Sequence, residues 1–122
     1  MTAMVRAIRG ATTVDEDRAE QVHERTQALV SEMLSRNEVA IDDLVSVMFT
    51  ATADISSAFP ATAARALGLD EVPLFGGQEL TVLGSLPRCI RVLMHCYSER
   101  ERAAIRHVFL EGARALRSDL KE

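Results

Sequence analysis

An apolar run, Cys89–Cys96, constrains the fold of this chain more than any other stretch. It lies between Pro87 and Ser98 and predicts a strand that is buried on both faces of a sheet. Arg91 interrupts the run. A guanidinium keeps its charge, and an unpaired one in a core costs several kcal/mol. Arg91 therefore needs an anion, supplied either by this chain or by a ligand.

The composition predicts a single globular domain over residues 1–122. Hydrophobic residues make up 48% of the chain and charged residues 26%, as in ordinary soluble proteins. The net charge of −4 argues against nucleic acids or anionic membranes as partners, because both need a basic face. No apolar run approaches the ~20 residues of a membrane span, and Arg6 and Arg9 interrupt any signal-peptide core.

The two cysteines favour a reducing compartment. Cys89 and Cys96 lie on the same expected strand, so roughly 23 Å separates them and they cannot form a disulfide with each other. The sequence has no CxxC motif and no cluster of His and Cys at metal-ligand spacing. We therefore expect a cytoplasmic protein without a structural metal.

The remaining pattern predicts an α+β fold. A capping box at Thr13–Glu16 begins a long amphipathic helix that ends near Arg36, and Pro60 begins a short helix. These helices lie on one face of a mixed sheet of about five strands. The other face is left bare, which indicates that a partner subunit covers it. The strands are expected at residues 4–12, 44–50, 72–75, 89–96 and 105–110.

The polar residues near strand ends and in short connections are mostly arginines. Arg9, Arg65, Arg91 and Arg117 are of this kind, and Glu79 follows a double glycine. Several guanidiniums with one carboxylate suit a small, multiply anionic molecule better than proton transfer at neutral pH. From the residues alone, Arg91 is as well explained by an internal pair with Glu79 as by a ligand. Arg65 and Arg117, taken singly, are better explained as ordinary surface residues.

The segment Arg6–Thr13, RAIRGATT, resembles the opening of the monofunctional chorismate mutases of the trimeric α/β class, as distinct from the all-helical class. The resemblance continues in the same order and covers essentially the whole chain. The further matching segments are residues 51–54, 59–61, 72–73 with 78–79, 88–92, 105–111 and 116–120.

The resemblance implies an isomerase that converts chorismate into prephenate in phenylalanine and tyrosine biosynthesis. The reaction is an intramolecular [3,3] rearrangement that needs no cofactor and no metal. The resemblance also implies a homotrimer with a pseudo-barrel core of packed sheets. Its active sites would lie in the clefts between neighbouring subunits, which agrees with the bare sheet face expected above.

The resemblance assigns roles to individual residues. Arg91 and Arg9 would be the two main catalytic arginines, with Arg91 facing the ether oxygen of the breaking C–O bond. Glu79 would accept a hydrogen bond from the substrate hydroxyl. Phe109 stands where the family commonly has tyrosine, and Thr62 where it often has lysine, so we expect weaker substrate binding. The other expected substrate-binding residues are Phe59 and Ala61 of the adjacent subunit, Leu74, Phe75 and Gly76 in the wall, and Arg65, Leu116 and Arg117 at the entrance.

Two alternatives stay open at this point. A non-catalytic trimer could bind a small dicarboxylate without turning it over. A purely structural trimer could use Arg91 only to pair with Glu79.

Overall fold

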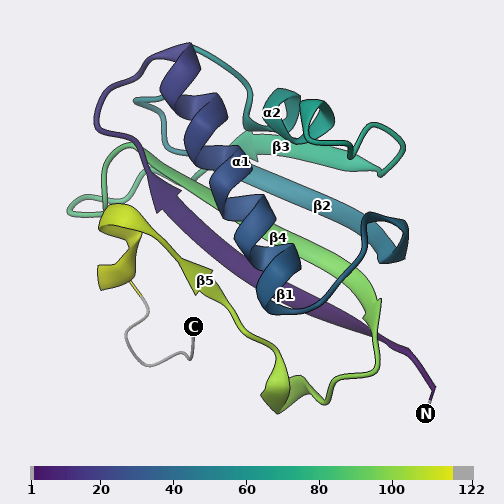
Figure 1. The fold of residues 1–122 in the computed structure, drawn as a ribbon. Helices are drawn as coiled ribbons and strands as arrows, with labels where there is room; N and C mark the ends of the chain where they lie inside the picture. The colour runs from purple at the N-terminus through teal and green to yellow at the C-terminus, as the bar shows by residue number, and fades with distance from the viewer. Residues whose placement is uncertain (1, 117–122) are drawn as a thin grey trace.

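β4 (Cys89–Ser98) is the central strand of a five-stranded mixed sheet with the order β3-β2-β4-β1-β5 (Figure 1). The computed structural model describes residues 2–116. β4 pairs antiparallel with both of its neighbours, while the two edge strands, β3 and β5, run parallel to β2 and β1. The other strands are β1 (Met4–Thr13), β2 (Leu44–Ala51), β3 (Leu74–Gln78) and β5 (Val108–Phe109).

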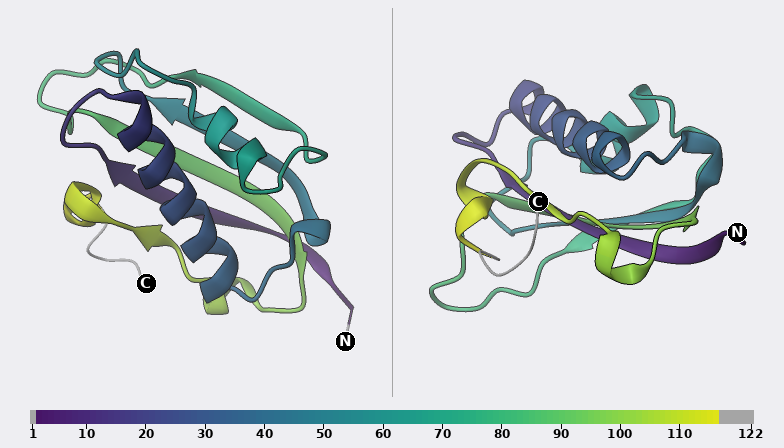
Figure 2. Two further views of the ribbon diagram at one scale, coloured as in Figure 1. Left: turned by 45° about the horizontal axis from the view of Figure 1, so that its top comes forward. Right: turned by 60° about the horizontal axis from the view of Figure 1, so that its bottom comes forward.

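Both α-helices, α1 (Ala19–Arg36) and α2 (Pro60–Ala66), lie on the same face of this sheet (Figure 2). Apolar side chains of that face and of α1 form the core, among them Phe49 and Met94. Gly10 lets α1 pack closely, because an added Cβ would lie 2.5 Å from Sδ of Met33. The expected α+β fold, with one long and one short helix on one face, is confirmed.

The predicted capping box at Thr13–Glu16 is wrong. α1 begins at Ala19, and its N-cap residue makes no side-chain hydrogen bond. The side chain of Gln21 instead accepts hydrogen bonds from the backbone N–H groups of the preceding loop. Thr13 ends β1, and its hydroxyl accepts a hydrogen bond of 3.0 Å from the N–H of Gly112. A tertiary contact therefore uses the hydroxyl that the local pattern assigned to the helix.

Three strand predictions also need correction. β3 begins later than expected and includes Gly76 and Gly77, because pairing with β2 holds these residues extended. β5 is shorter than the expected strand over residues 105–110. β4 is buried on one face only, since buried and partly exposed residues alternate along it. Arg91 belongs to the partly exposed set.

The sheet face opposite the helices, which we call the open face, carries exposed apolar side chains. Within residues 2–116 no α-helix covers it, and the loop between β3 and β4 extends on this side (Figure 2). Strand pairing places Val5 opposite Tyr97 and Met48 beside Phe75 on this face. Phe75 is 70% exposed, and the other three are exposed as well.

Short 3₁₀ turns complete the chain. η1 (Ile41–Asp43) precedes β2, η2 (Arg102–Ala104) precedes β5, and η3 (Glu111–Ala115) follows it. Ala113 of η3 packs on the open face against Ala11 and Cys89. η3 therefore covers the end of the open face that lies beside Arg91.

Candidate active site

Arg91 and Glu79 form an ion pair on the open face. Nε of Arg91 lies 3.3 Å from Oε1 of Glu79, and the two side chains are 36% and 31% exposed. The anion that Arg91 needs is thus present in its own chain. The pair is also open to solvent, so a small anionic molecule can reach it.

The backbone and one neighbouring hydroxyl fix Glu79. It directly follows β3, and its N–H donates a hydrogen bond of 2.8 Å to the carbonyl oxygen of Ala51. The hydroxyl of Thr50 donates a hydrogen bond of 2.6 Å to Oε1 of Glu79. By contrast, Nε of Arg91 is buried and makes no hydrogen bond with the described residues. The charge of Glu79 therefore holds the Arg91 guanidinium, while hydrogen bonds with Ala51 and Thr50 hold Glu79.

A cluster of hydrogen bonds fixes the start of β4, two residues before Arg91. The backbone N–H of Arg88 donates to both carboxylate oxygens of Asp54, at 3.1 and 3.0 Å. Arg88 has a φ of 47°, in the left-handed region that non-glycine residues rarely adopt. The hydroxyl of Thr52 accepts a hydrogen bond of 2.9 Å from the N–H of Cys89. These contacts determine where β4, and with it Arg91, lies in the sheet.

Arg9, Phe109 and Leu116 lie on the same side as Arg91. Arg91 is opposite Ala11 in the β1–β4 ladder, so Arg9 is its diagonal neighbour on the open face. The backbone N–H of Arg9 donates a hydrogen bond of 3.0 Å to Nδ1 of His107. Phe109 pairs with Ala11 from β5, is buried, and belongs to the cluster against which Leu116 packs. Arg117 lies outside the described residues.

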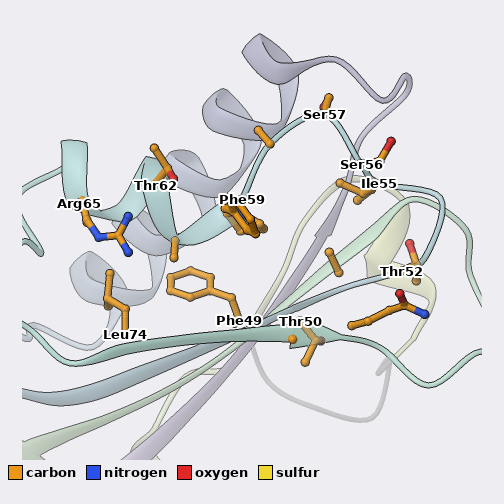
Figure 3. A pocket seen from close by; sticks show the side chains of 17 residues that line it. Phe49, Thr50, Thr52, Ile55, Ser56, Ser57, Phe59, Thr62, Arg65 and Leu74 are labelled. Carbon is orange, nitrogen blue, oxygen red and sulfur yellow. The ribbon is translucent and has the colours of Figure 1, made fainter.

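A second group of predicted residues surrounds a cleft on the helix side of the sheet. The cleft has a volume of about 740 Å³, within the range of small-molecule sites. Figure 3 shows Phe59 and Arg65 of the α2 region beside Phe49 of β2, while Thr50 points to the other side of the strand. The predicted residues that line the cleft are Phe59, Ala61, Arg65, Leu74 and Gly76.

Within one chain the sheet separates the two groups. Arg91, Arg9 and Glu79 belong to the open face or its edge, whereas α2 lies on the helix side. Phe75 differs from its neighbours in the sequence, because successive strand residues point to opposite faces. It belongs to the open face with Met48 and does not line the cleft.

The charges of the open-face group suit binding and electrostatic stabilisation. Two guanidiniums and one carboxylate offer paired N–H donors for carboxylates and one acceptor for a hydroxyl. Burial raises the pKa of the neighbouring Cys89 thiol, although Arg91 opposes this effect. Cys89 is therefore protonated at neutral pH and is not a nucleophile here.

Residues 2–116 offer neither a membrane-spanning helix nor a cluster of metal ligands. No helix there has the length and apolar character needed to cross a membrane. No group of three or more His, Cys, Asp or Glu side chains there is placed to hold a metal ion.

The fold and the site together define an α+β protein with a solvent-accessible arginine–carboxylate site on a bare sheet face. Residues 5–120 match the family described as chorismate mutase type I. The chain is 47% identical over 119 residues to the chorismate mutase AroH of Thermus thermophilus, across 97% of this chain and 98% of that protein. It is 41% identical over 118 residues to the chorismate mutase AroH of Bacillus subtilis (strain 168), across 96% of this chain and 93% of that protein.

A solved structure of a chorismate mutase from Clostridium thermocellum has the same fold. Its TM-score with this chain is 0.88 at 44% sequence identity, over 89% of this chain and 97% of that one. The chain therefore belongs to the chorismate mutase type I family, and it is an enzyme of the isomerase class. The resemblance stated from the sequence is confirmed.

Thr50, Thr52 and Asp54 are the residues that sequence reasoning did not select individually. The stretch 51–54 carried the resemblance, and a polar loop after a strand was a weak signal for Thr52 and Asp54. Thr50 gave no signal, since it is one more β-branched residue in a strand.

Proposed function

We propose that this chain converts chorismate into prephenate in phenylalanine and tyrosine biosynthesis, at active sites that neighbouring subunits of a homotrimer build together. The reaction breaks one C–O bond and forms one C–C bond within a single molecule. Membership of the chorismate mutase type I family supports the reaction. One observation supports a site shared between subunits: the predicted residues lie on two sides of one sheet.

The bare open face supports the trimer. Contact with copies of the same chain would bury its apolar side chains, which are otherwise exposed to water. In the proposed assembly three sheets pack into a pseudo-barrel core, and the cleft beside α2 of one subunit faces the open face of the next. The proposal includes a cytoplasmic location, which the two unpaired cysteines support. The side chains to be covered include Val5, Met48, Tyr97, Leu80 and Leu83.

The proposed site first selects the shape of the substrate. Arg9, with Arg65 and Arg117 at the entrance, binds the two carboxylates by paired hydrogen bonds. Phe59 and Ala61 of the adjacent subunit provide an apolar wall. Chorismate then stays in its compact diaxial form, in which the two carbons that bond are close together. Holding this conformer removes part of the entropic barrier.

Arg91 then stabilises the transition state. As the C–O bond lengthens, negative charge grows on the ether oxygen, and the guanidinium of Arg91 faces that charge. β4 is paired on both sides, so the position of Arg91 does not have to reorganise during the reaction. Glu79 accepts a hydrogen bond from the substrate hydroxyl and fixes the ring. Interactions that strengthen in the transition state raise the rate, which is the role proposed for Arg91.

The test is to mix the purified protein with chorismate and follow the loss of its ultraviolet absorbance. The proposal expects saturable acceleration over the spontaneous rate, with prephenate as the product and no added metal or cofactor. Saturable binding without acceleration would contradict it and would favour the dicarboxylate-binding trimer instead. Absence of any protection against thermal unfolding by chorismate would favour the structural trimer.

A further inference from the structure

We propose that Thr50 is a positioning residue that fixes the Glu79 carboxylate against Arg91. The inference rests on the proposed function and deepens it, because Thr50 acts on the substrate only through Glu79. Thr50 lies on β2, and no pattern in the sequence singles it out.

The geometry that carries the proposal is a shared carboxylate oxygen. Thr50 lies directly opposite Arg91 in the β2–β4 ladder, so their side chains point to the same face. Oε1 of Glu79 accepts the hydrogen bond from Thr50 at 2.6 Å and lies 3.3 Å from Nε of Arg91. With Oε1 engaged by both partners, Oε2 is the oxygen that serves the substrate hydroxyl.

Glu79 needs such a partner because its own element does not hold it firmly. It follows an edge strand, and a glutamate side chain with three rotatable bonds populates several rotamers unless a contact selects one. Thr50 lies on an interior strand, and its β-branched side chain has a restricted χ1. Its hydroxyl is therefore a rigid donor.

The position of Arg91 depends on the same contact. Nε of Arg91 is buried and makes no hydrogen bond within residues 2–116, so β4 places the backbone of Arg91 while the charge of Glu79 orients its guanidinium. If the carboxylate turned away, the guanidinium would lose its ion pair with Glu79. One hydroxyl thus fixes the relative placement of the acceptor and the cation.

Two substitutions separate positioning from packing. Thr50→Val keeps the β-branched shape and removes the donor, whereas Thr50→Ser keeps the donor and removes the methyl group. We expect kcat/KM for chorismate to fall about tenfold in Thr50→Val and less than about threefold in Thr50→Ser. A role in packing or strand propensity alone predicts the opposite order, with valine the milder change, and that order would contradict the proposal.

Thr12→Val is the matched control. Thr12 is a buried strand threonine on the helix side of β1, and its hydroxyl has no hydrogen-bond partner among the described residues. Its replacement should leave kcat/KM unchanged. A tenfold loss in this control as well would show that any buried Thr→Val change in the sheet disturbs the enzyme, and would contradict the specific role of Thr50.

The decisive arm repeats Thr50→Val in a Glu79→Ala background. Because the hydroxyl acts through Glu79, the second substitution should then change kcat/KM by less than about twofold. An undiminished tenfold loss would overturn the inference. Glu79→Ala alone tests the proposed function, and full activity in that variant would overturn the role of Glu79 itself. If Glu79→Ala loses most of its activity while Thr50→Val stays fully active, only the role of Thr50 is overturned.

Discussion

Arg65 and Arg91 lie on opposite sides of one sheet. Arg65 extends from α2 beside the cleft on the helix side, and Arg91 lies on the open face. A packed layer of strands and side chains lies between them, which disfavours contact of one small molecule with both arginines of a single subunit. If both arginines serve the same substrate, the two halves of the site come from different subunits.

Arg91 is the residue whose removal should cost the most activity. Replacing it with alanine should lower kcat for chorismate by at least about 100-fold, because a preorganised donor to the developing charge is lost. Arg91→Lys keeps the charge but not the planar fork of donors, so its activity should lie between those of the alanine variant and the wild type. Steady-state kinetics at saturating chorismate measure both effects.

Arg18→Ala is the control for this series. Arg18 is an exposed arginine before α1 whose side chain pairs with Glu16 and Glu20, and it is assigned no substrate contact. It should keep kcat within about threefold. Near-normal turnover in Arg91→Ala, with the assembly intact by light scattering, would rule out the electrostatic mechanism.

The open face should control assembly. Met48 is 37% exposed there, so Met48→Glu would place a charge in the proposed subunit interface. We expect its mass in solution to fall from that of three chains to that of one. Ala28→Glu, on the exposed side of α1, is the control and should remain trimeric. Light scattering coupled to size exclusion measures both, and a trimeric Met48→Glu would contradict the interface.

Asp17 should make stability depend on pH in acid. Hydrogen bonds from Ser57 and Ser56, in the loop that leads to the cleft, lower the pKa of Asp17 from 3.8 to about 2. A lowered pKa means that the contribution of Asp17 is complete above the unfolded value and is lost as the pH falls through the folded value. The difference in unfolding free energy between wild type and Asp17→Asn should therefore be constant above about pH 5 and shrink towards pH 2.

Denaturant titrations at a fixed protein concentration measure this difference. A difference for Asp17→Asn that grew as the pH fell would have the wrong sign for a lowered pKa.

Much of the fold could be predicted because its strongest patterns are local. The apolar run over β4 and the periodicity of α1 each indicate one element. β4 and the end of α1 lie where they were expected, whereas α1 begins at Ala19, after the predicted capping box. The prediction that β4 is buried on both faces was wrong for a physical reason. Leu93 and Tyr97 are apolar but lie on the open face, so a single chain leaves them partly exposed or exposed.

The errors and omissions concern residues whose partners are distant in the sequence. Thr13 was predicted to cap the long helix, but its hydroxyl accepts a hydrogen bond from the N–H of Gly112. Gly76 and Gly77 have low strand propensity, and only pairing with β2 makes them a strand. Thr50 and Glu79 are brought together by the same parallel pairing, which no local pattern contains. Arg9 and Arg91 were among the four arginines that the sequence pattern singled out, but their catalytic roles could be assigned only through the family resemblance.

Mixed trimers test the shared active site most directly. One variant, Arg91→Ala, lacks the open-face half of the site. The other, Arg65→Glu, repels the substrate carboxylates from the cleft half. Each alone should have little activity. When equal amounts are unfolded, mixed and refolded together, about a quarter of the sites should combine two intact halves, because the halves come from neighbouring subunits at random.

We expect the mixture to recover about a quarter of the wild-type activity, in proportion to the fraction of mixed trimers. Different affinity tags on the two variants allow the mixed species to be isolated and counted. If the mixed trimers had no more activity than the average of the two parents, the proposal that each site is built from two subunits would be wrong.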